Sequence, residues 1–278
     1  MTLGRRDIQT LLDRHGLRPS RALGQHFVAD ANTVRRIARL AGVGPGDRVI
    51  EIGAGLGSLT LALAETGAAV TAVEVDRYLL PALCEVVGPA GVAVVAGDAR
   101  ALDWQAVLGG EAGWALVANL PYNVATPMVV ELLEGVPAIS RMLVLVQREV
   151  GERLAAGVGD PAYGAVSVKV AYWATGSVVG RVPRTVFLPP PKVDSALVRI
   201  ERRPSPAVPP DEVSYEALFD LVRAGFAHRR KMLRRALAGR ADQAAFACAG
   251  VAPEARAEAL DVVAWGKLAR CVSGPAPS

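Results

Sequence analysis

Cysteine is scarce in this chain of 278 residues, which holds only Cys84, Cys248 and Cys271. The number is odd and the spacing wide, so the sequence shows neither a disulfide framework nor the ligand spacing of a metal site. We therefore expect three reduced thiols, as is usual in the cytosol, and no metal. Aromatic residues are also few, at 5% of the chain. The core must therefore be built mainly from aliphatic side chains.

Long apolar runs are missing as well. No stretch reaches the roughly 18 continuous apolar residues that a membrane-spanning helix needs. The first ten residues are polar and charged, which argues against a secretory signal. We expect a cytoplasmic protein without a membrane partner. At 51% hydrophobic, the chain is still able to bury a large core, in one big domain or in a big and a small one.

The net charge of +4 is mild, but the basic residues are unevenly distributed. Residues 1–48 contain nine Arg against four Asp, and residues 221–235 contain six Lys or Arg and no acidic residue. An even distribution would only aid solubility. Charge gathered in two segments indicates a polyanionic partner.

Short apolar runs alternate with helix-like segments between Arg48 and Glu201. Strands with little polar alternation indicate a parallel sheet that is covered on both faces, and hence a doubly wound, Rossmann-like α/β domain. Two later runs predict an antiparallel pair at the end of the same sheet. The expected strands are 48–52, 69–74, 92–96, 114–118, 141–147, 176–182 and 194–201.

A proline-rich segment over residues 203–213 reads as a semi-rigid linker. The residues after it, from Ser214 onward, show helical patterns and an Ala-rich composition. We therefore predict two domains, a large sheet domain with an N-terminal helical arm over 1–203 and a small α-helical domain over 204–278.

The first chemical motif is a glycine turn that follows the strand 48–52. Glu51 precedes Gly53, Gly55 and Gly57. Glycine permits a tight turn and the close approach of a ligand, although such a cluster alone is weak evidence. The G-x-G-x-G spacing and the acidic residue before it both differ from the dinucleotide fingerprint.

Two further carboxylates end the next two predicted strands. Glu74 lies about 20 positions after Gly53, the separation at which an acidic residue accepts hydrogen bonds from ribose hydroxyls, or it is a solvated strand-end group. Asp98 either accepts from an adenine amino group or caps the following helix. Acidic groups at three successive strand ends, beside a glycine turn, favour an adenosine-containing cofactor.

The tetrapeptide Asn119-Leu120-Pro121-Tyr122 follows the apolar run 114–118. It supplies a side-chain acceptor, a fixed backbone carbonyl and an aromatic face, which suits a planar exocyclic amine held beside a cofactor. By itself, the tetrapeptide is equally compatible with a turn that ends the strand. With the glycine turn upstream, it favours S-adenosylmethionine over NAD, because it adds a site for a nucleophilic amine.

Five collinear motifs, from about Leu17 to the last helices, resemble the small-subunit ribosomal RNA adenine dimethyltransferases. That family methylates N6 of two adjacent adenines near the 3′ end of 16S rRNA. The resemblance implies this reaction, S-adenosylmethionine as methyl donor, a 16S rRNA partner within the small ribosomal subunit, and a part in ribosome biogenesis. The motifs are residues 23–27, 51–57, 119–122, 187–195 and 226–231.

The resemblance also implies roles for individual residues. Asn119 Oδ1 and the Leu120 carbonyl would accept the two N6 hydrogens. Pro121 belongs to the same loop. Tyr122 and Phe187 would stack on the two faces of an unstacked base. Glu51 would orient the glycine loop. His26 departs from the Asn usual at that position. The implied cofactor-binding residues are Gln25, His26, Val28, Glu51, Gly53, Gly55, Glu74, Asp98, Ala99 and Asn119.

Basic residues between 221 and 235 are the predicted RNA contacts. A single helix over 221–235 would place Arg223, Arg230 and Arg234 on one face, and six uncompensated charges make a merely solvated face the weaker interpretation. The second domain would then contact RNA through Arg223, His228, Arg229, Arg230, Lys231 and Arg234.

Two other functions stay open at this point. One is a large-subunit (23S) rRNA adenine N6-methyltransferase of the macrolide-resistance type. The other is a mainly RNA-binding ribosome-assembly factor; the presence of Glu74, Asp98 and the intact Asn119–Tyr122 motif argues against it, since a pure binder needs none of them. We expect a monomer in either case.

Overall fold

The computed structural model describes residues 2–228 and 230–273, and the chain divides into two compact units. The sheet unit comprises residues 1–151 and 177–201, and the helical unit comprises residues 152–176 and 202–278. A single boundary after residue 203 therefore misplaces residues 152–176. The reason is apolar packing, because Val168 and Tyr172 of this segment are buried in the same core as Trp265 of the helical unit.

The central sheet has seven strands in the order β4-β3-β2-β5-β6-β9-β7. The first five are parallel, and β9 runs antiparallel to β6. The predicted Rossmann-like fold is thus confirmed, with its last two strands adjacent at one edge. The strands are β2 (Arg48–Ile52), β3 (Ala69–Glu74), β4 (Ala93–Ala96), β5 (Trp114–Asn119), β6 (Ile139–Gln147), β7 (Ala174–Val182) and β9 (Ser195–Arg202).

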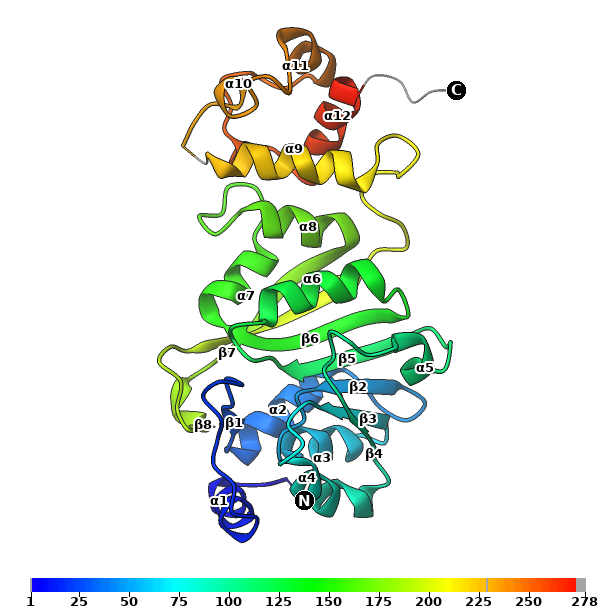
Figure 1. The fold of residues 1–278 in the computed structure, drawn as a ribbon, viewed down its shortest axis with the longest axis vertical. Coiled ribbons are helices and arrows are strands. Elements are labelled where there is room, and N and C mark those ends of the chain that lie inside the picture. The colour runs from blue at the N-terminus through cyan, green and yellow to red at the C-terminus, as the bar shows by residue number, and fades with distance from the viewer. Residues whose placement is uncertain (1, 229, 274–278) are drawn as a thin grey trace. The chain divides into compact units, whose positions relative to one another are not determined.

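Helices cover both faces of this sheet within the sheet unit. Figure 1 shows α2 and α3 on one side of the strands and α6 on the other. Alternate apolar residues of the strands, such as Val49 and Val117, pack against Val34 of α2 and Leu63 of α3. The helices of this unit include α1 (Arg5–Arg14), α2 (Ala31–Ala41), α3 (Ser58–Ala64), α4 (Leu80–Val87), α5 (Trp104–Leu108) and α6 (Ala125–Gly135).

The glycine turn joins β2 to α3 through backbone conformations that favour glycine. Gly55 and Gly57 have φ angles of +59° and +84°. A Cβ at Gly55 would lie 3.0 Å from the Phe27 ring, and a Cβ at Gly57 would lie 2.7 Å from Val87 Cγ1. The turn is therefore tight both in its own backbone and against its neighbours.

A two-stranded ladder ties the N-terminal loop to a distant segment. Strand β1 (Phe27–Val28) pairs antiparallel with β8 (Phe187–Leu188), and Ala29 N–H donates to the Val186 carbonyl at 2.7 Å. The Arg5 guanidinium on α1 donates to the carbonyls of Thr185 and Phe187, at 2.8 and 3.2 Å. These bonds bring the loop before β1 over the glycine turn.

The helical unit has its own core around Trp265 and Phe219, both almost completely buried. Cys248 and Cys271, on two of its helices, form a disulfide. The expectation of three reduced thiols is therefore wrong for these two, because the packing of α11 on α12 brings them together. The helices are α8 (Ala165–Trp173), α9 (Tyr215–Ala227), α10 (Leu233–Ala236), α11 (Gln243–Ala249) and α12 (Val262–Ser273), while α7 (Arg148–Ala155) connects the units.

Candidate functional site

Two adjoining cavities open at the carboxyl ends of β2, β3 and β5, where open α/β sheets bind ligands. Their volumes are about 90 and 170 Å³, and both are lined by Leu23, Gly53, Val75 and Pro121. We call them the first and second cavity. The first is lined by eight of the ten predicted cofactor residues, and Asp98 and Ala99 line the second with Gly53.

Glu74 lines the first cavity and forms hydrogen bonds that hold the glycine turn. Its Oε2 accepts the Gly55 N–H at 2.7 Å, and its Oε1 accepts the Asp76 N–H at 2.8 Å. The carboxyl group is almost fully buried, and this burial raises its pKa, against the opposing effect of the backbone N–H groups of Asp76, Gly55 and Val75. Two carboxylate oxygens offer about four acceptor sites, so Glu74 both fixes the glycine turn and remains able to accept from a ligand.

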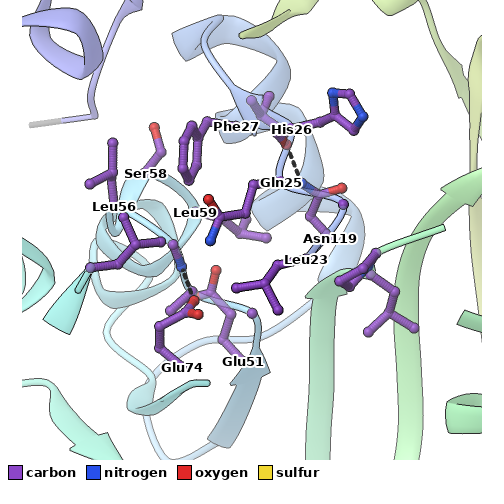
Figure 2. Close-up of a pocket in the computed structure, with 18 of the residues that line it drawn as sticks. Leu23, Gln25, His26, Phe27, Glu51, Leu56, Ser58, Leu59, Glu74 and Asn119 are labelled. Atoms are coloured by element: carbon purple, nitrogen blue, oxygen red, sulfur yellow. Dashed lines mark hydrogen bonds between the residues drawn. The ribbon is translucent and has the colours of Figure 1, made fainter. Parts of the chain in front are cut away.

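Glu51 also lines the first cavity but is held differently. Its side chain is 1% exposed, and Oε2 has no hydrogen-bond partner among the described residues. Burial raises the pKa of this carboxyl to about 8; the nearby Thr60 hydroxyl opposes this shift, and the neighbouring Glu74 adds to it. The predicted orienting bond to the glycine loop comes from Glu74 (Figure 2). The Glu51 carboxyl instead presents an unmatched acceptor or donor beside the cavity.

Gln25 anchors the loop that covers the first cavity. Its Nε2 donates to Asp76 Oδ2 at 2.7 Å, and its Oε1 accepts the Ser20 N–H at 2.7 Å. Both ends of the side-chain amide are thus engaged within the protein. Gln25 lines the cavity and fixes the loop to the end of β3, and Val28 lines the same cavity from β1.

Asn119 stands at the last position of β5, and its side-chain orientation is set by one hydrogen bond. Asn119 Nδ2 donates to the His26 carbonyl at 2.9 Å (Figure 2). Because a carbonyl only accepts, this contact assigns the nitrogen of the amide to His26 and leaves Oδ1 as the other end. The half-buried Asn119 therefore offers an acceptor to the first cavity, which it lines.

Tyr122 and His26 form an aromatic wall. The Tyr122 hydroxyl hydrogen-bonds Ser195 Oγ at 2.7 Å, and burial is the main cause of a raised Tyr122 pKa. The imidazole of His26 stacks on the Tyr122 ring with centroids 5.7 Å apart and a 25° interplanar angle. His26 Nδ1 lies 2.7 Å from the Pro189 carbonyl, which requires the proton to sit on Nδ1. His26 is therefore a built part of the wall and more than an ordinary loop residue.

Asp98 follows β4 and is exposed. Its Oδ1 accepts the Arg100 N–H at 2.9 Å. The next helix, α5, is capped by Asp103, whose carboxylate accepts the Ala106 N–H. The helix-cap interpretation of Asp98 is therefore wrong, and its carboxylate stands at the rim of the second cavity, beside the buried Ala99.

Leu120 and Phe187 are both buried in the sheet unit, at 1% and 0% exposure. Leu120 lines the first cavity, and its N–H donates to the Leu145 carbonyl. Phe187 lines neither cavity, because its pairing with Val28 places it in the core cluster of α2 and α3. The structure thus does not bring Phe187 together with Tyr122 as a second face of a base clamp.

The predicted helix over 221–235 is interrupted. Helix α9 ends at Ala227 and α10 begins at Leu233, with Met232 paired to Arg256 in an isolated bridge. Backbone pairing with the segment before residue 256 replaces helical bonds there, so Arg223, Arg230 and Arg234 do not share a helix face.

The charges of this basic segment are partly compensated from outside it. Arg223 pairs with Asp220, and Arg234 lies 3.6 Å from Glu254. His228 and Lys231 are exposed beside Arg230. Arg229 lies outside the described residues. Fewer than six basic charges are therefore uncompensated, because Asp220 and Glu254 lie outside residues 221–235 but contact arginines within them.

Several site residues were missed by the sequence reasoning. Asp76 holds Gln25, Ser195 holds Tyr122, and the Pro189 carbonyl holds His26. Asp76 stands two positions after Glu74, a signal that was available. The other two depend on β8 and β9 returning to the site, which no local pattern reveals.

The chain was compared with known proteins. The family model for ribosomal RNA adenine dimethylases matches residues 17–272. The chain belongs to this family. A protein of Cutibacterium acnes named ribosomal RNA small subunit methyltransferase A is 50% identical over 95% of this chain and 91% of its own length. A protein of the same name from Streptomyces coelicolor is 48% identical, over 96% of each chain.

Solved structures give the same fold. The 23S rRNA methyltransferase ErmE is 26% identical with a TM-score of 0.69, over 89% of this chain and 100% of that one. A dimethyladenosine transferase from Plasmodium falciparum reaches a TM-score of 0.71 at 23% identity, over 87% and 96%. The ribosomal RNA adenine dimethylase family uses S-adenosylmethionine, and its members act on ribosomal RNA.

The cavities fit that cofactor on an observation of the structure itself. The buried Glu51 Oε2 lacks a partner in the described part of the chain, and S-adenosylmethionine carries ammonium, hydroxyl and amino donors. Among the described residues, no group of three His, Cys, Asp or Glu is placed to hold a metal ion, and no helix there has the length and apolar character to cross a bilayer. Absence of a metal stays a prediction.

Proposed function

We propose that this ribosomal RNA adenine dimethylase acts on the small subunit, methylating N6 of two adjacent adenines near the 3′ end of 16S rRNA. The proposal includes a part in ribosome biogenesis, a monomeric state and a cytoplasmic location. The small-subunit names of relatives at 48–50% identity support the substrate. The observation that carries the chemistry is the orientation of Asn119 by the His26 carbonyl.

Glu51, Glu74 and Asp98 are the residues that would hold the cofactor. The Glu74 carboxyl keeps acceptor capacity for ribose hydroxyls, and Asp98 Oδ1 accepts one backbone N–H among the described residues, that of Arg100. The glycine turn brings backbone close to the ligand at Gly53 and Gly55. S-adenosylmethionine supplies an electrophilic sulfonium methyl group when bound, so no strong general base is needed.

Asn119 and Leu120 make the adenine amine a better nucleophile. The lone pair of an aromatic amine is delocalised into the ring, which weakens its attack. Asn119 Oδ1 accepts one N6 hydrogen and the Leu120 carbonyl accepts the other, which favours a tetrahedral nitrogen. Positioning of this kind lowers the barrier by several kcal/mol when the reacting atoms are held about 3–3.5 Å apart.

Tyr122 supplies a stacking face for the unstacked base, and the His26 ring already covers the other face of Tyr122. The two rings are 5.7 Å apart, and a ring inserted between them needs about 7 Å, twice the roughly 3.5 Å carbon contact distance. The base therefore stacks on the face of Tyr122 opposite His26. Stacking of this kind is worth about 1–3 kcal/mol per base.

The exposed basic residues Arg230 and Lys231, with His228 beside them, contribute phosphate contacts from the helical unit. Arg223 and Arg234 contribute less, because each already faces a carboxylate. Affinity for the ribosomal subunit should fall steeply with salt.

The test is methyl transfer from labelled S-adenosylmethionine to undermethylated small ribosomal subunits and, in parallel, to large-subunit RNA. We expect dimethyladenosine near the small-subunit 3′ end with wild-type protein and almost none with Asn119→Ala. Label confined to large-subunit RNA would contradict the proposed small-subunit substrate. The large-subunit arm is included because the 23S rRNA methyltransferase ErmE is 26% identical to this chain. Tight RNA binding without label would instead make the protein an assembly factor.

A further inference from the structure

A third cleft opens at the carboxyl end of β6, the strand beside the one that carries Asn119. Its volume is about 500 Å³, larger than that of either cavity of the methylation site. We call it the β6 cleft. It lies within the sheet unit and is lined by Gln147, Arg148, Glu149, Arg184, Lys192, Val193 and Asp194.

The β6 cleft is physically joined to the proposed base site. Gln147 at the end of β6 pairs with Ser195 at the start of β9, and Ser195 Oγ holds the Tyr122 hydroxyl at 2.7 Å. Asp194, in the cleft wall, directly precedes Ser195. Neighbouring strands are about 4.8 Å apart, so the cleft begins within roughly one nucleotide of the base that stacks on Tyr122.

Two basic side chains of the cleft have no ion-pair partner in the described part of the chain. Arg184 and Lys192 are exposed, and neither forms an ion pair among the described residues. Among the described residues, the Arg184 guanidinium donates only to the Lys192 carbonyl, at 3.4 Å, and this bond holds the two residues next to each other. Uncompensated cations at a concave site attract an anion.

The carboxylate of Asp194 lowers the positive charge of the cleft, but it forms no ion pair with Arg184 or Lys192 among the described residues, and its hydrogen bond shapes the loop. Asp194 Oδ1 accepts the Arg184 backbone N–H at 3.0 Å, and the Asp194 carbonyl accepts the Arg148 N–H at 3.0 Å. The second bond is made at the first residue of α7, so the amino-terminal end of that helix also borders the cleft. Helix amino termini favour anions. Glu149 is the remaining carboxylate of the lining.

We propose that the β6 cleft binds a phosphodiester of the RNA strand next to the inserted adenine, with Arg184 and Lys192 as its cationic ligands. This proposal rests on the proposed function for the identity of the polyanion. The contact would hold the strand on the β6 side while the base occupies the Tyr122 face. Arg184 and Lys192 are then RNA-positioning residues that touch no reacting atom.

The test uses full-length protein and undermethylated small ribosomal subunits. Lys192→Gln, Arg184→Gln and their double variant are compared with Arg35→Gln, which removes another exposed arginine, on α2 and outside all three cavities. Binding is measured over a series of salt concentrations, alongside S-adenosylmethionine affinity by calorimetry and the RNA KM and kcat at saturating cofactor.

Each lost phosphate contact should lower the slope of log affinity against log salt by about 0.7, and the double variant by about 1.4. At about 0.1 M salt this corresponds to roughly fivefold weaker binding per contact and roughly twenty-fivefold for both. RNA KM should rise accordingly, with cofactor affinity unchanged. Arg184→Lys, which keeps the charge, should restore most of the slope.

An unchanged salt slope in the double variant would contradict phosphate binding by the cleft. This holds even if activity fell, because a loss of activity alone can come from a distorted loop. A slope change as large in Arg35→Gln would overturn it too, by showing a diffuse charge effect. If wild-type protein methylates no ribosomal RNA while the slopes still differ, the cleft stands and the proposed function fails. Lys192→Gln leaves the Arg184 contact to the Lys192 carbonyl in place, so it tests the cleft where the arginine variant misfolds.

Discussion

The cofactor cavities and the basic segment of the helical unit were both anticipated from residue patterns, yet only the first came together as expected. In the cavities, Glu51, Glu74 and Asn119 lie at the ends of adjacent parallel strands. In the basic segment, the predicted helix would have placed Arg223, Arg230 and Arg234 on one face, but α9 ends at Ala227.

The contrast has a physical cause. Parallel strands place their carboxyl ends at one edge of the sheet whatever the intervening helices do, so strand-end residues converge. A helix face exists only while the helix continues, and here the competing Met232–Arg256 bridge ends it. Patterns that depend on topology are thus more secure than patterns that depend on an unbroken element.

Asn119→Ala should lower kcat by about 10²- to 10³-fold, the usual effect of deleting one preorganised polar contact to a reacting centre. Thermal stability should change little, because the one side-chain hydrogen bond of Asn119 among the described residues is that to the His26 carbonyl. Single-turnover methyl transfer measures the effect. Asn119→Asp is the matched control, since it keeps an acceptor but loses the donor to His26. A kcat within threefold of wild type for Asn119→Ala would remove the residue from the site.

Glu51→Gln should change how stability depends on pH. The carboxyl has a pKa of about 8 when folded and about 4.5 when unfolded, so the folded state holds a proton that the unfolded state releases in between. This contribution is fully present below pH 4.5 and is lost as the pH rises toward 8. At pH 9 the variant should gain on wild type by a few kcal/mol, at about 1.4 kcal/mol per pKa unit.

Urea denaturation of the cofactor-free protein between pH 5 and pH 9 checks this. The difference between wild type and Glu51→Gln isolates Glu51 from Glu74, whose pKa is raised in the same direction. A stability difference that does not vary with pH would show that Glu51 is already ionised at neutral pH.

Phe187→Leu should cost about 1–2 kcal/mol of stability as a core substitution but leave the RNA KM nearly unchanged. The reason is that Phe187 is fully buried and lines neither cavity. If Phe187 stacks on the base after all, losing about 1–3 kcal/mol of stacking would raise the KM roughly 5- to 150-fold. Steady-state kinetics beside thermal melting separates the two roles, and Tyr122→Leu is the matched control at the wall.

Arg230→Gln should lower the salt dependence of RNA binding by about 0.7 in slope, and Arg223→Gln by clearly less, because Asp220 already neutralises Arg223. Filter binding to small subunits at several salt concentrations measures both. Equal effects would mean that the Asp220 pair opens when RNA binds. An effect only in Arg223→Gln would restore the single-face interpretation of the basic segment.

The sequence by itself determined the sheet, the strand limits to within a few residues, and a set of catalytic and cofactor residues of which all but Phe187 line the cavities. The reason is that buried parallel strands are continuous apolar runs and their ends are marked by glycine and acidic residues. It also identified the family, through motifs spread over most of the chain.

Only the tertiary structure decided how those residues are held. The Ser195 contact that tethers Tyr122, the Pro189 contact that orients His26, the burial of Phe187 and the Cys248–Cys271 disulfide all join segments that local patterns do not relate. Transfer of residues 152–176 to the helical unit has the same origin. Such contacts are set by which surfaces pack together after the chain has folded back, and that choice is made by the whole core rather than by any single stretch of sequence.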